Sequence, residues 1–439
     1  MTSPAIRSHV ISIIQSEGLP GIIRRLRRMR SNLARVERTA AILQIKPLGY
    51  EAWSQRFDTP DAEDCAALIA AIADLRIDCV VIVSSPERSA LQASLQALVQ
   101  SIRKPDSVRL LFASSISAEE RATLEAEAAA SLAPLGIVPP QQGETDCTII
   151  IPAGYAMRPH ALALLAAEFV QMPDLAFFYG DEARSENGKL QPWFKPDYAP
   201  LMARSGRLVT GPVAFNHRNA HAAACVKALV HSVDDYDARL IDWTIAQPRT
   251  TIGHVPHVLA TTALPLPPRH DVTPALSSTP IVSIIIPTRN FWSVLKPCLD
   301  SLKNTDWPQD KLDIIVVDNG SDDPETLQGL TAREEAGEIR IIRHDRPFNW
   351  SELNNVGAAQ AKGSVLVFLN NDIEVIEPDW LKKLVAFASL PQAGAVGCKL
   401  LYPDRTVQHG GVVIGIQGVA GHAHLFLDAK DKGYNGLAN

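Results

Sequence analysis

The sequence lacks several features that would assign a protein class at once. No run of apolar residues approaches the roughly 18 needed to span a bilayer, so we predict no transmembrane helix. The first residues, MTSPAIRSHVISII, lack a basic segment followed by a clean apolar core, so a secretory signal is not expected. The six cysteines are scattered and form no CxxC pair, which indicates buried thiols in a reducing compartment rather than a zinc site.

A strong excess of one charge and a glycine-rich turn are also missing. The formal net charge is -6 over 439 residues, and such mild acidity gives no indication of a nucleic-acid-binding surface. A dinucleotide-dependent oxidoreductase would need GxGxxG between a first strand and its helix. The turn after the apolar run VSIIIPT reads PTRNFW and contains no glycine, so this class is not predicted.

Basic residues do gather near the N-terminus. Apolar residues recur at helical spacing over residues 18–40, which predicts an amphipathic helix within a helical region at 1–59. The arginines that surround its apolar stripe are Arg24, Arg25, Arg27, Arg28 and Arg30. One interpretation is a peripheral contact with an anionic membrane surface, and the other is a solvated helix packed on its own protein. We expect a cytoplasmic protein, held at the inner face of the cell membrane under the first interpretation.

The length of 439 residues predicts two or three domains. Residues 60–262 and 281–439 each alternate apolar strand-like runs with helical segments, which is typical of an α/β fold with a mostly parallel sheet and flanking helices. Residues 263–280 between them hold five prolines, which excludes a helix or a central strand and predicts a partly extended linker.

The apolar runs of the second half predict strands at IVSIIIPT, LDIIVVDNGS, IRIIRHD, SVLVFLNND and GAVGCKLLY. Polar residues follow several of these runs at the points where the predicted strands end. Ligands of an open parallel sheet lie beyond the carboxyl ends of its strands, so Thr288, Asp318 and Asp372 are expected at one edge. Asp372 ends the stretch VFLNND, and its cluster with two amides exceeds what a helix cap needs. For Asp322 and Asp323, which precede PETLQGL, we favour a capping or turn role.

Four stretches of the second half carry a family resemblance: VSIIIPTRN, IIVVDNGSDD, FNWSELNNVGAAQAKGSVLVFLNNDIEV and GAVGCKLLYPDRTVQHGGVVIG. Together they resemble a family 2 glycosyltransferase with the GT-A fold, and they are most similar to bacterial enzymes of the rhamnosyltransferase type, which build surface polysaccharide. The resemblance implies a nucleotide-sugar donor, dTDP- or UDP-linked, and inversion at the anomeric carbon. It also implies Mg²⁺ or Mn²⁺ on the diphosphate, which suits a leaving group that gains negative charge.

The same resemblance implies roles for individual residues. Asp372 matches the last acid of the family's DxD motif and hence the metal ligand, whereas Asn370 stands where the first acid is often found and would bind a ribose hydroxyl. Asp318 matches the acid that contacts the base or ribose. The remaining matches are to the loop beneath the nucleotide, Pro287 and Thr288, and to the helix that faces the donor, Asn355 and Gly357.

Three histidines lie in VQHGGVVIGIQGVAGHAHLF: His409, His422 and His424. Histidine can act as a base, a metal ligand or a phosphate donor. For each of the three alone, we favour a structural or acceptor-loop role over catalysis.

The first half repeats the pattern of the second without its acids. RLLFASSIS aligns with DIIVVDNGS and puts Ser114 in the place of Asp318, while TIIIPAG aligns with LVFLNND and puts Gly154 in the place of Asp372. We interpret residues 60–262 as a GT-A-like domain that has lost its metal and nucleotide groups and serves as a scaffold or an acceptor-binding module. Asp181 and Glu182 either mark a remaining site or belong to a turn before SENGK.

A glycosyltransferase also needs a general base for the acceptor hydroxyl. In the family that acid lies downstream of the matched stretches, so we expect it beyond Asn439 and consider the second GT-A-like domain truncated. The predicted function is transfer of a sugar to a glycan or lipid-linked acceptor in surface polysaccharide synthesis. The alternative is a non-catalytic fragment that binds a nucleotide-sugar or a glycan.

Overall fold

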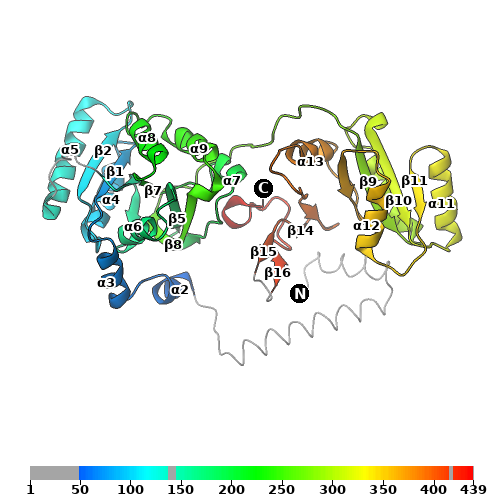
Figure 1. Cartoon of the computed structure of the whole chain (residues 1–439), viewed down its shortest axis with the longest axis horizontal. Helices are drawn as coiled ribbons and strands as arrows, with labels where there is room; N and C mark the ends of the chain where they lie inside the picture. Colours follow the sequence, from blue (N-terminus) through cyan, green and yellow to red (C-terminus); the bar gives the residue numbers. More distant parts are fainter. Residues whose placement is uncertain (1–48, 137–144, 415–418, 439) are drawn as a thin grey trace, which may run out of the picture. The chain divides into compact units, whose positions relative to one another are not determined.

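The computed structural model describes residues 49–136, 145–414 and 419–438 of the chain (Figure 1). The chain divides into two compact units, Met1–Val272 together with Lys432–Asn439, and Thr273–Asp431. The predicted basic helix and its five arginines lie outside the described residues, so the membrane interpretation stays a prediction. Among the described helices, none combines the length and the apolar character that a membrane span requires.

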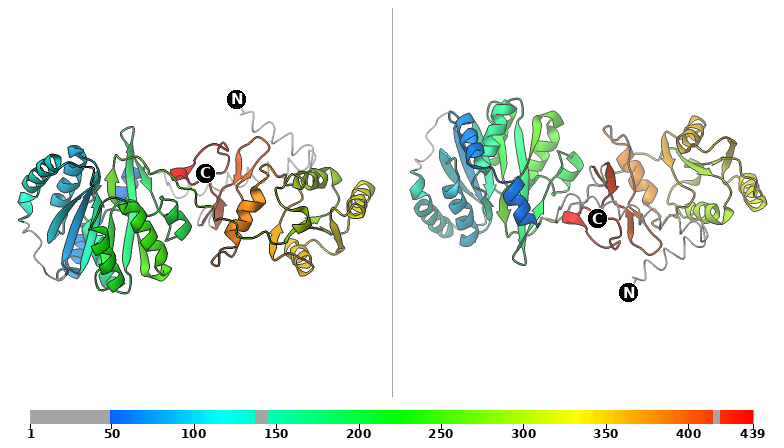
Figure 2. Two further views of the ribbon diagram at one scale, coloured as in Figure 1. Left: turned by 90° about the horizontal axis from the view of Figure 1, so that it is seen from above. Right: turned by 90° about the horizontal axis from the view of Figure 1, so that it is seen from below.

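The first unit is built around an eight-stranded sheet with helices packed on both faces (Figure 2). In chain order its main elements are α2 (Tyr50–Phe57), α3 (Ala62–Ala71), β1 (Ile77–Val83), α4 (Arg88–Gln100), β2 (Ser107–Phe112), α5 (Ala118–Leu132), β3 (Cys147–Pro152), β4 (Tyr155–Met157), α6 (Ala161–Gln171), β5 (Phe177–Glu186), β6 (Lys189–Trp193), α7 (Pro200–Arg204), β7 (Val213–Asn216), α8 (Ala220–Leu229), α9 (Tyr236–Ala246) and β8 (Ile252–Thr262).

The sheet of the first unit has the strand order β2-β1-β3-β7-β5-β8-β4, and β6 pairs with β5. β1 pairs in parallel with β2 and β3, and β5 pairs in parallel with β8. β7 runs antiparallel between β3 and β5. The predicted α/β class is confirmed, with the addition of one antiparallel strand inside the sheet that the apolar pattern did not reveal.

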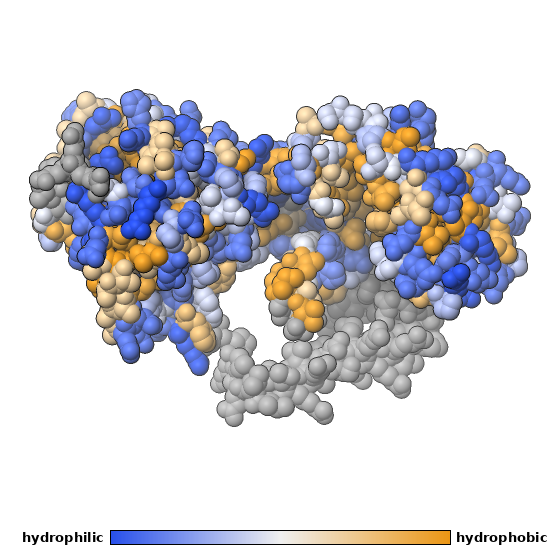
Figure 3. All heavy atoms as spheres, in the orientation of Figure 1, coloured by the Kyte–Doolittle hydropathy of each residue, from blue (hydrophilic) through white to orange (hydrophobic). Residues whose placement is uncertain are grey.

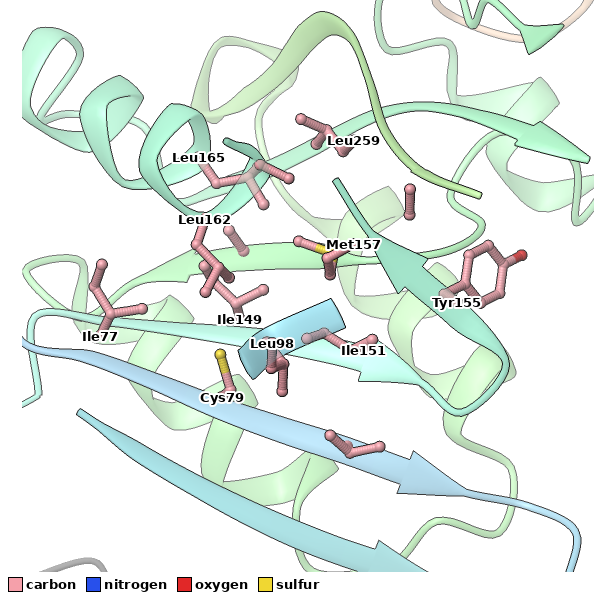
Figure 4. Close-up of a cluster of buried hydrophobic side chains, with 14 of the residues drawn as sticks. Ile77, Cys79, Leu98, Ile149, Ile151, Tyr155, Met157, Leu162, Leu165 and Leu259 are labelled. Atoms are coloured by element: carbon pink, nitrogen blue, oxygen red, sulfur yellow. The ribbon is translucent and has the colours of Figure 1, made fainter. Parts of the chain in front are cut away.

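Two apolar clusters hold the helices of the first unit against its sheet. Every residue of β1 is buried, as expected for a continuous apolar strand flanked on both sides. On one face Leu98 of α4 and Leu162 of α6 join the cluster around Ile149 (Figure 4), and on the other face α8 and α9 cover Phe215. Removing a fully buried leucine such as Leu98 costs about 2–5 kcal/mol, so this core dominates the stability of the unit.

The second unit contains a four-stranded parallel sheet with the order β11-β10-β9-β12. Its main elements are β9 (Val282–Thr288), α10 (Trp292–Leu302), β10 (Leu312–Asp318), α11 (Pro324–Glu335), β11 (Arg340–Arg343), α12 (Trp350–Ala359), β12 (Val365–Phe368), α13 (Trp380–Ala388), β13 (Leu400–Leu401), β14 (Val407–His409), β15 (Val412–Ile414) and β16 (Ala420–His422). β10-β9-β12 therefore repeats the parallel arrangement of β2-β1-β3 in the first unit.

β12 forms the edge of the second sheet. Its only strand partner among the described residues is β9, and the apolar side chains of Leu366 and Phe368 remain 39% and 49% exposed. In the first unit β3 holds the same position beside β1. The other side of β3 pairs with β7, and the first five residues of β3 are buried. The two sheets thus agree in their first three strands and differ beyond them.

One predicted strand of the second half is largely wrong. The apolar stretch GAVGCKLLY forms only the two-residue strand β13, which pairs antiparallel with β14 in a separate small sheet. Leu400 and Leu401 pair with β14 instead of extending the main sheet beside β12. Residues 263–281 contain neither helix nor strand, as their prolines predict.

Candidate functional site

The parallel strands of the second unit end together at one edge of the sheet. Asp318, the last residue of β10, stands opposite Thr288, the last residue of β9. Beyond β12 the backbone N–H of Leu369 still donates to the Ile285 carbonyl at 3.0 Å, which directs the chain toward residues 370–372. The segments expected to meet at the carboxyl edge of the sheet therefore do end there.

Thr288 connects the other two strand ends. It is buried, and its carbonyl accepts a hydrogen bond from the backbone N–H of Asn319 at 2.8 Å. Its hydroxyl oxygen accepts a hydrogen bond from the side-chain amide of Asn371 at 3.1 Å. Asn371 is thus oriented by β9, which leaves its own carbonyl oxygen as an acceptor for a ligand.

The carboxylate of Asp318 is buried and held by its neighbours. Its Oδ1 accepts hydrogen bonds from the backbone N–H of Ser321 at 2.9 Å and from the Ser321 hydroxyl at 2.6 Å. Its Oδ2 forms an ion pair with the guanidinium of Arg343 at the end of β11, which also donates to the Ser321 carbonyl at 2.8 Å. The Arg343 side chain is 46% exposed, so its remaining N–H donors are accessible beside a fixed carboxylate.

Asn290 clamps the loop after β9 to the loop after β10. Asn290 and Phe291 have φ of 56° and 58°, a left-handed conformation that asparagine tolerates better than most residues. The Asn290 carbonyl oxygen Oδ1 accepts from the backbone N–H groups of Asp322 and Asp323 at 3.0 and 3.1 Å. Its backbone N–H donates to the Ser321 hydroxyl at 2.7 Å, so both loops are fixed before any ligand arrives.

Asp323 confirms the capping role expected for this pair of acids. Its side chain accepts a hydrogen bond from the backbone N–H of Thr326 at 2.9 Å, at the first turn of α11. Asp322 accepts a hydrogen bond from the Asn290 side chain at 2.9 Å instead. Both acids therefore stabilise the loop rather than extend toward a ligand.

The two polar residues after β12 differ in how firmly they are held. The side-chain oxygen of Asn370 accepts a hydrogen bond from the Trp350 indole N–H at 3.3 Å, which ties it to the first residue of α12. Asp372 is exposed, and among the described residues no hydrogen bond or ion pair engages its carboxylate. Compared with Asp318, Asp322 and Asp323, Asp372 therefore has the carboxylate that a cation can reach.

These donors fit a hard divalent cation carried by a diphosphate. Within residues 49–136, 145–414 and 419–438, no group of three or more His, Cys, Asp or Glu side chains could enclose a metal ion. Mg²⁺ and its analogues take oxygen ligands and are usually bound through one or two carboxylates plus substrate phosphates. Asp372, with the amide oxygen of Asn371 beside it, supplies such a partial set.

The other expected site residues are placed less directly. Pro287 lies on β9 opposite Val317, and Asn355 is an exposed residue of α12. A Cβ added to Gly357 would lie 2.5 Å from Ile285 Cγ2, so this glycine lets α12 pack closely on the sheet. Packing alone explains Gly357, and donor contacts for these three residues stay predictions.

The histidine segment forms part of two small sheets. His409 ends β14 and His422 ends β16, and their Nδ1 atoms are 2.9 Å apart. The His424 Nδ1–H donates to the Gly410 carbonyl at 3.0 Å, which agrees with the structural role favoured for a single histidine.

The first unit has no acid at either matching position. The alignment of Ser114 with Asp318 is wrong, because Phe112 ends β2 opposite Val83 as Asp318 ends β10 opposite Thr288. Ser114 lies two residues further on, and its backbone N–H donates to Asp234 at 3.1 Å. Gly154 follows β3 with φ of 96°, and a Cβ there would lie 3.1 Å from Leu264 Cδ1. The Gly154 carbonyl also accepts a hydrogen bond from the Thr262 hydroxyl at 2.8 Å. Packing against Leu264 and the positive φ both disfavour a side chain at this position.

Asp181 and Glu182 do not lie in a turn, so that interpretation is wrong. Both are buried in β5, and the turn follows at Asn187 and Gly188, which have positive φ. Burial raises the pKa of Glu182, but the Lys195 and Arg184 charges outweigh burial and lower it below its usual value. Its Oε2 lies 3.1 Å from the Lys195 Nζ and accepts from the Thr210 hydroxyl at 3.0 Å.

Asp181 is occupied in a similar way. Its Oδ1 accepts a hydrogen bond from the Lys195 backbone N–H at 2.8 Å and lies 2.8 Å from the His254 Nε2. The Arg184 guanidinium pairs with Glu182 and donates to the carbonyls of Leu264 and Pro265, at 2.6 and 3.0 Å. These contacts describe an internal ion-pair cluster that closes this part of the first unit.

Comparison with known proteins assigns the second unit. Residues 283–417 match the model of glycosyl transferase family 2. The second unit belongs to glycosyltransferase family 2. The chain is 31% identical over 368 residues to the O-antigen biosynthesis protein RfbC of Myxococcus xanthus, covering 74% of this chain and 27% of that protein. It is 43% identical over 187 residues to the uncharacterized protein y4gI of Sinorhizobium fredii, covering 42% of this chain and 20% of that protein.

Solved structures give weaker matches to this chain. The mannosyltransferase PcManGT from Pyrobaculum calidifontis, in complex with GDP-Man and Mn²⁺, has a TM-score of 0.28 at 24% identity and covers 42% of this chain and 48% of that one. S. aureus TarS 1-349 in complex with UDP-GlcNAc has a TM-score of 0.22 at 28% identity and covers 24% and 30%. Scores this low support no argument about the fold, which rests on the strand order itself.

Several residues of the candidate site were not predicted from the sequence. Arg343, Asn290 and Trp350 each bond to a residue of the predicted set or to its loop. Arg343 was not foreseeable, because its role depends on β11 pairing with β10. Asn290 gave a usable signal, since asparagine in a glycine-free turn is typical of a left-handed residue.

Proposed function

We propose that this chain is part of a glycosyltransferase that moves a sugar from a nucleotide-sugar to a glycan or lipid-linked acceptor in surface polysaccharide synthesis. The single observation that carries the proposal is the uncommitted carboxylate of Asp372 at the same edge of the sheet as the fixed pair of Asp318 and Arg343, within a unit that matches family 2. The named role of the Myxococcus relative in O-antigen biosynthesis supports the same substrate class. The chain spans 27% of that relative and 20% of the Sinorhizobium relative. The activity of the whole protein is therefore proposed and not assigned.

In this proposal different residues at the strand ends bind the nucleoside and the diphosphate of the donor. Asp318 and Arg343 orient the nucleoside, with Thr288 and Pro287 beneath it and Asn370 toward the ribose. Asp372 and the Asn371 amide oxygen would hold Mg²⁺ or Mn²⁺ together with the diphosphate, and such an ion would supply positive charge for the leaving group. Loops already fixed by Asn290 bind the donor without first being ordered, which preserves affinity.

The finer features of the reaction follow from the family resemblance. We propose inversion at the anomeric carbon by direct displacement, with a general base that takes the proton from the acceptor hydroxyl. We assign no described residue as that base. The first unit, with its closed ion-pair cluster and no acid at either matching position, acts as a scaffold or acceptor-binding module. A peripheral membrane contact through the N-terminal arginines remains part of the same hypothesis.

A non-catalytic binding protein is the second candidate. The observation in its favour is that both Asp318 carboxylate oxygens already have protein partners, Ser321 and Arg343. Such a site would suit a protein that binds a donor without transferring its sugar. A bound nucleoside can still share an ionised carboxylate, since its two oxygens offer about four acceptor sites. Binding without transfer would therefore support this candidate over the enzyme.

The test uses the full chain with UDP-, dTDP- and GDP-sugars in the presence of Mg²⁺. Ligand-detected NMR should show saturable binding of one donor class that disappears on addition of EDTA. Slow release of the free nucleoside diphosphate, measured with a coupled assay, should follow only for that donor. Donor binding without any release, with lipid-linked or glycan acceptors supplied, would favour the non-catalytic candidate. The absence of binding to every donor would overturn both.

A further inference from the structure

The histidine segment after β13 has no role in the donor site described above. β14 pairs with β13, and β15 pairs with β16, so this part of the second unit consists of two short hairpins. Figure 3 shows apolar atoms gathered at the β15–β16 hairpin, where Ile414 is 81% exposed. His409 and His422 come from the two hairpins and meet each other.

The two imidazoles approach each other nitrogen to nitrogen. His409 Nδ1 lies 2.9 Å from His422 Nδ1, the ring centroids are 5.0 Å apart, and the ring planes are 84° apart. A neutral imidazole has only one N–H, so such a contact requires one Nδ1 to donate and the other to offer its lone pair. Both Nδ1 lone pairs can converge on one point once the donating ring changes tautomer and carries its hydrogen on Nε2 instead.

The backbone fixes where these rings stand. His409 pairs with Leu400 across the first hairpin, and His422 pairs with Val412 across the second. The His424 Nδ1–H donates to the carbonyl of Gly410, the residue after His409, which joins the two hairpins once more. Since strand pairing positions both side chains, little ordering is left for a ligand to impose.

This arrangement matches the chemistry of a transition-metal ligand pair. Imidazole suits Zn²⁺, Cu²⁺ and Ni²⁺, whereas Mg²⁺ and Mn²⁺ prefer oxygen. Two Zn–N bonds of about 2.0–2.1 Å at a tetrahedral angle separate the nitrogens by roughly 3.4 Å, so the rings need to part by about half an ångström. Because no third His, Cys, Asp or Glu among the described residues completes the set, water or an added ligand fills the other positions.

We infer that His409 and His422 form a binding site for an imidazole-preferring divalent ion, with Zn²⁺ as the ion to test. The site is separate in chemistry from the oxygen-lined edge at Asp372. A bound ion would tie β14 to the β15–β16 hairpin through two coordinate bonds in place of one hydrogen bond. It would therefore stabilise the fold of this segment whether or not the donor site is active.

The experiment is a calorimetric titration of the full chain with ZnCl₂ in excess Mg²⁺, which keeps oxygen sites occupied. We expect one saturable Zn²⁺ site in the wild type and at least about tenfold weaker binding in His409→Asn and in His422→Asn. Asparagine keeps a polar side chain for the hydrogen bond but is a poor Zn²⁺ ligand, so folding is retained. His221→Asn, which alters an exposed histidine at the start of α8, is the matched control and should bind as the wild type does.

A second readout follows the ring nitrogens directly. In ¹⁵N NMR spectra of the histidines, Zn²⁺ should shift Nδ1 of two residues, and these signals should vanish together in either variant. The inference is overturned if Zn²⁺ binds both variants as tightly as the wild type, because the ligands then lie elsewhere, for example at thiols. It is equally overturned if the wild type shows no saturable site, since the pair is then only a hydrogen bond.

Discussion

The two sheets are alike at the amino ends of their first strands and unlike at the carboxyl ends. In the first unit Ser107 of β2 donates its hydroxyl hydrogen to Asp78 of β1 at 2.8 Å. In the second unit Ser283 of β9 donates to Asp313 of β10 at 2.7 Å, so the same pair occurs with its residues exchanged between strands. The two sheets thus share an Asp–Ser hydrogen bond at the amino ends of their strands and differ in their polar residues at the carboxyl ends.

The two carboxyl edges differ in more than the acids that they carry. In the first unit Gly154 packs against Leu264, and Glu182 pairs with Lys195 and Arg184 in a buried cluster. In the second unit Asp372 is exposed and its carboxylate is unbonded within the described residues. The comparison teaches that a sheet edge either supplies polar groups to a ligand or satisfies them internally, because unpaired buried charges are costly.

The largest loss of stability is expected from breaking the buried ion-pair cluster of the first unit. Glu182→Ala leaves the Lys195 ammonium and the Arg184 guanidinium buried without their counter-charge, which should lower the free energy of unfolding by about 3–5 kcal/mol. Urea unfolding of the full chain, followed by circular dichroism, measures it. Glu186→Ala on the same strand removes an exposed carboxylate and should change stability little. Equal losses in both variants would mean that the cluster does not stabilise the unit.

The second prediction addresses the open edge. Asp372→Asn removes the carboxylate proposed to hold the ion and should weaken Mn²⁺-dependent donor binding at least about tenfold, or about 1.4 kcal/mol. Calorimetry with Mn²⁺ and the donor identified by NMR measures the loss. Glu377→Gln, the same chemical change at a nearby exposed acid, should retain binding. Unchanged affinity in Asp372→Asn would remove this residue from the metal role.

Restoring an acid to the first unit tests whether its edge can be reopened. Gly154→Asp should destabilise the chain by about 1–3 kcal/mol and create no metal binding, because the new Cβ meets Leu264 and the positive φ is strained. Gly188→Asp is the matched control, since its φ is also positive but nothing lies within 4 Å of its Cβ. The difference between the two in thermal unfolding isolates the packing contribution. A stable Gly154→Asp variant that binds Mn²⁺ would contradict the closed-edge interpretation.

The shared Asp–Ser pair predicts a pH effect in the second unit. Burial raises the pKa of Asp313, but hydrogen bonds from Arg340, Ser283 and the Lys362 backbone outweigh it and lower the pKa to about 2. A lowered folded-state pKa adds stability above the unfolded value near 4, and this stability is lost as pH falls toward 2. The contribution is about 2 kcal/mol. Urea unfolding at pH 5 and pH 3 should show a steeper loss for the wild type than for Asp313→Asn, and parallel losses would exclude Asp313 as the source.

The smallest effect concerns the nucleoside. Asp318→Ala should weaken binding of the free nucleoside diphosphate without metal by about five- to tenfold, or roughly 1 kcal/mol, since a charged hydrogen-bond partner is lost. Competition NMR at matched protein concentrations measures this change. Asp323→Ala, which removes a helix cap on the same loop, provides the control for loop damage. Full affinity in Asp318→Ala would show that the base or ribose contact lies elsewhere.

The parts predicted correctly from sequence depend on short-range patterns. Continuous apolar runs gave the parallel strands, and the polar residues at their ends gave Thr288 and Asp318 as neighbours. Long-range pairing was beyond the pattern, so the Arg343 contact with Asp318 and the antiparallel β7 were not foreseen. The same limitation explains the predicted strand at GAVGCKLLY, whose apolar residues found no place in the main sheet.

Leu366 and Phe368 on β12 have a practical consequence for handling this protein. An edge strand with bare backbone N–H and C=O groups and apolar side chains is a template for pairing with other chains. Preparations of residues 273–431 should therefore tend toward concentration-dependent aggregation through this strand, while the first unit, in which β7 covers the matching edge, should stay dispersed. A lysine placed at position 366 is the change most suited to keep such samples in solution, because a charge on an edge strand disfavours strand-to-strand association.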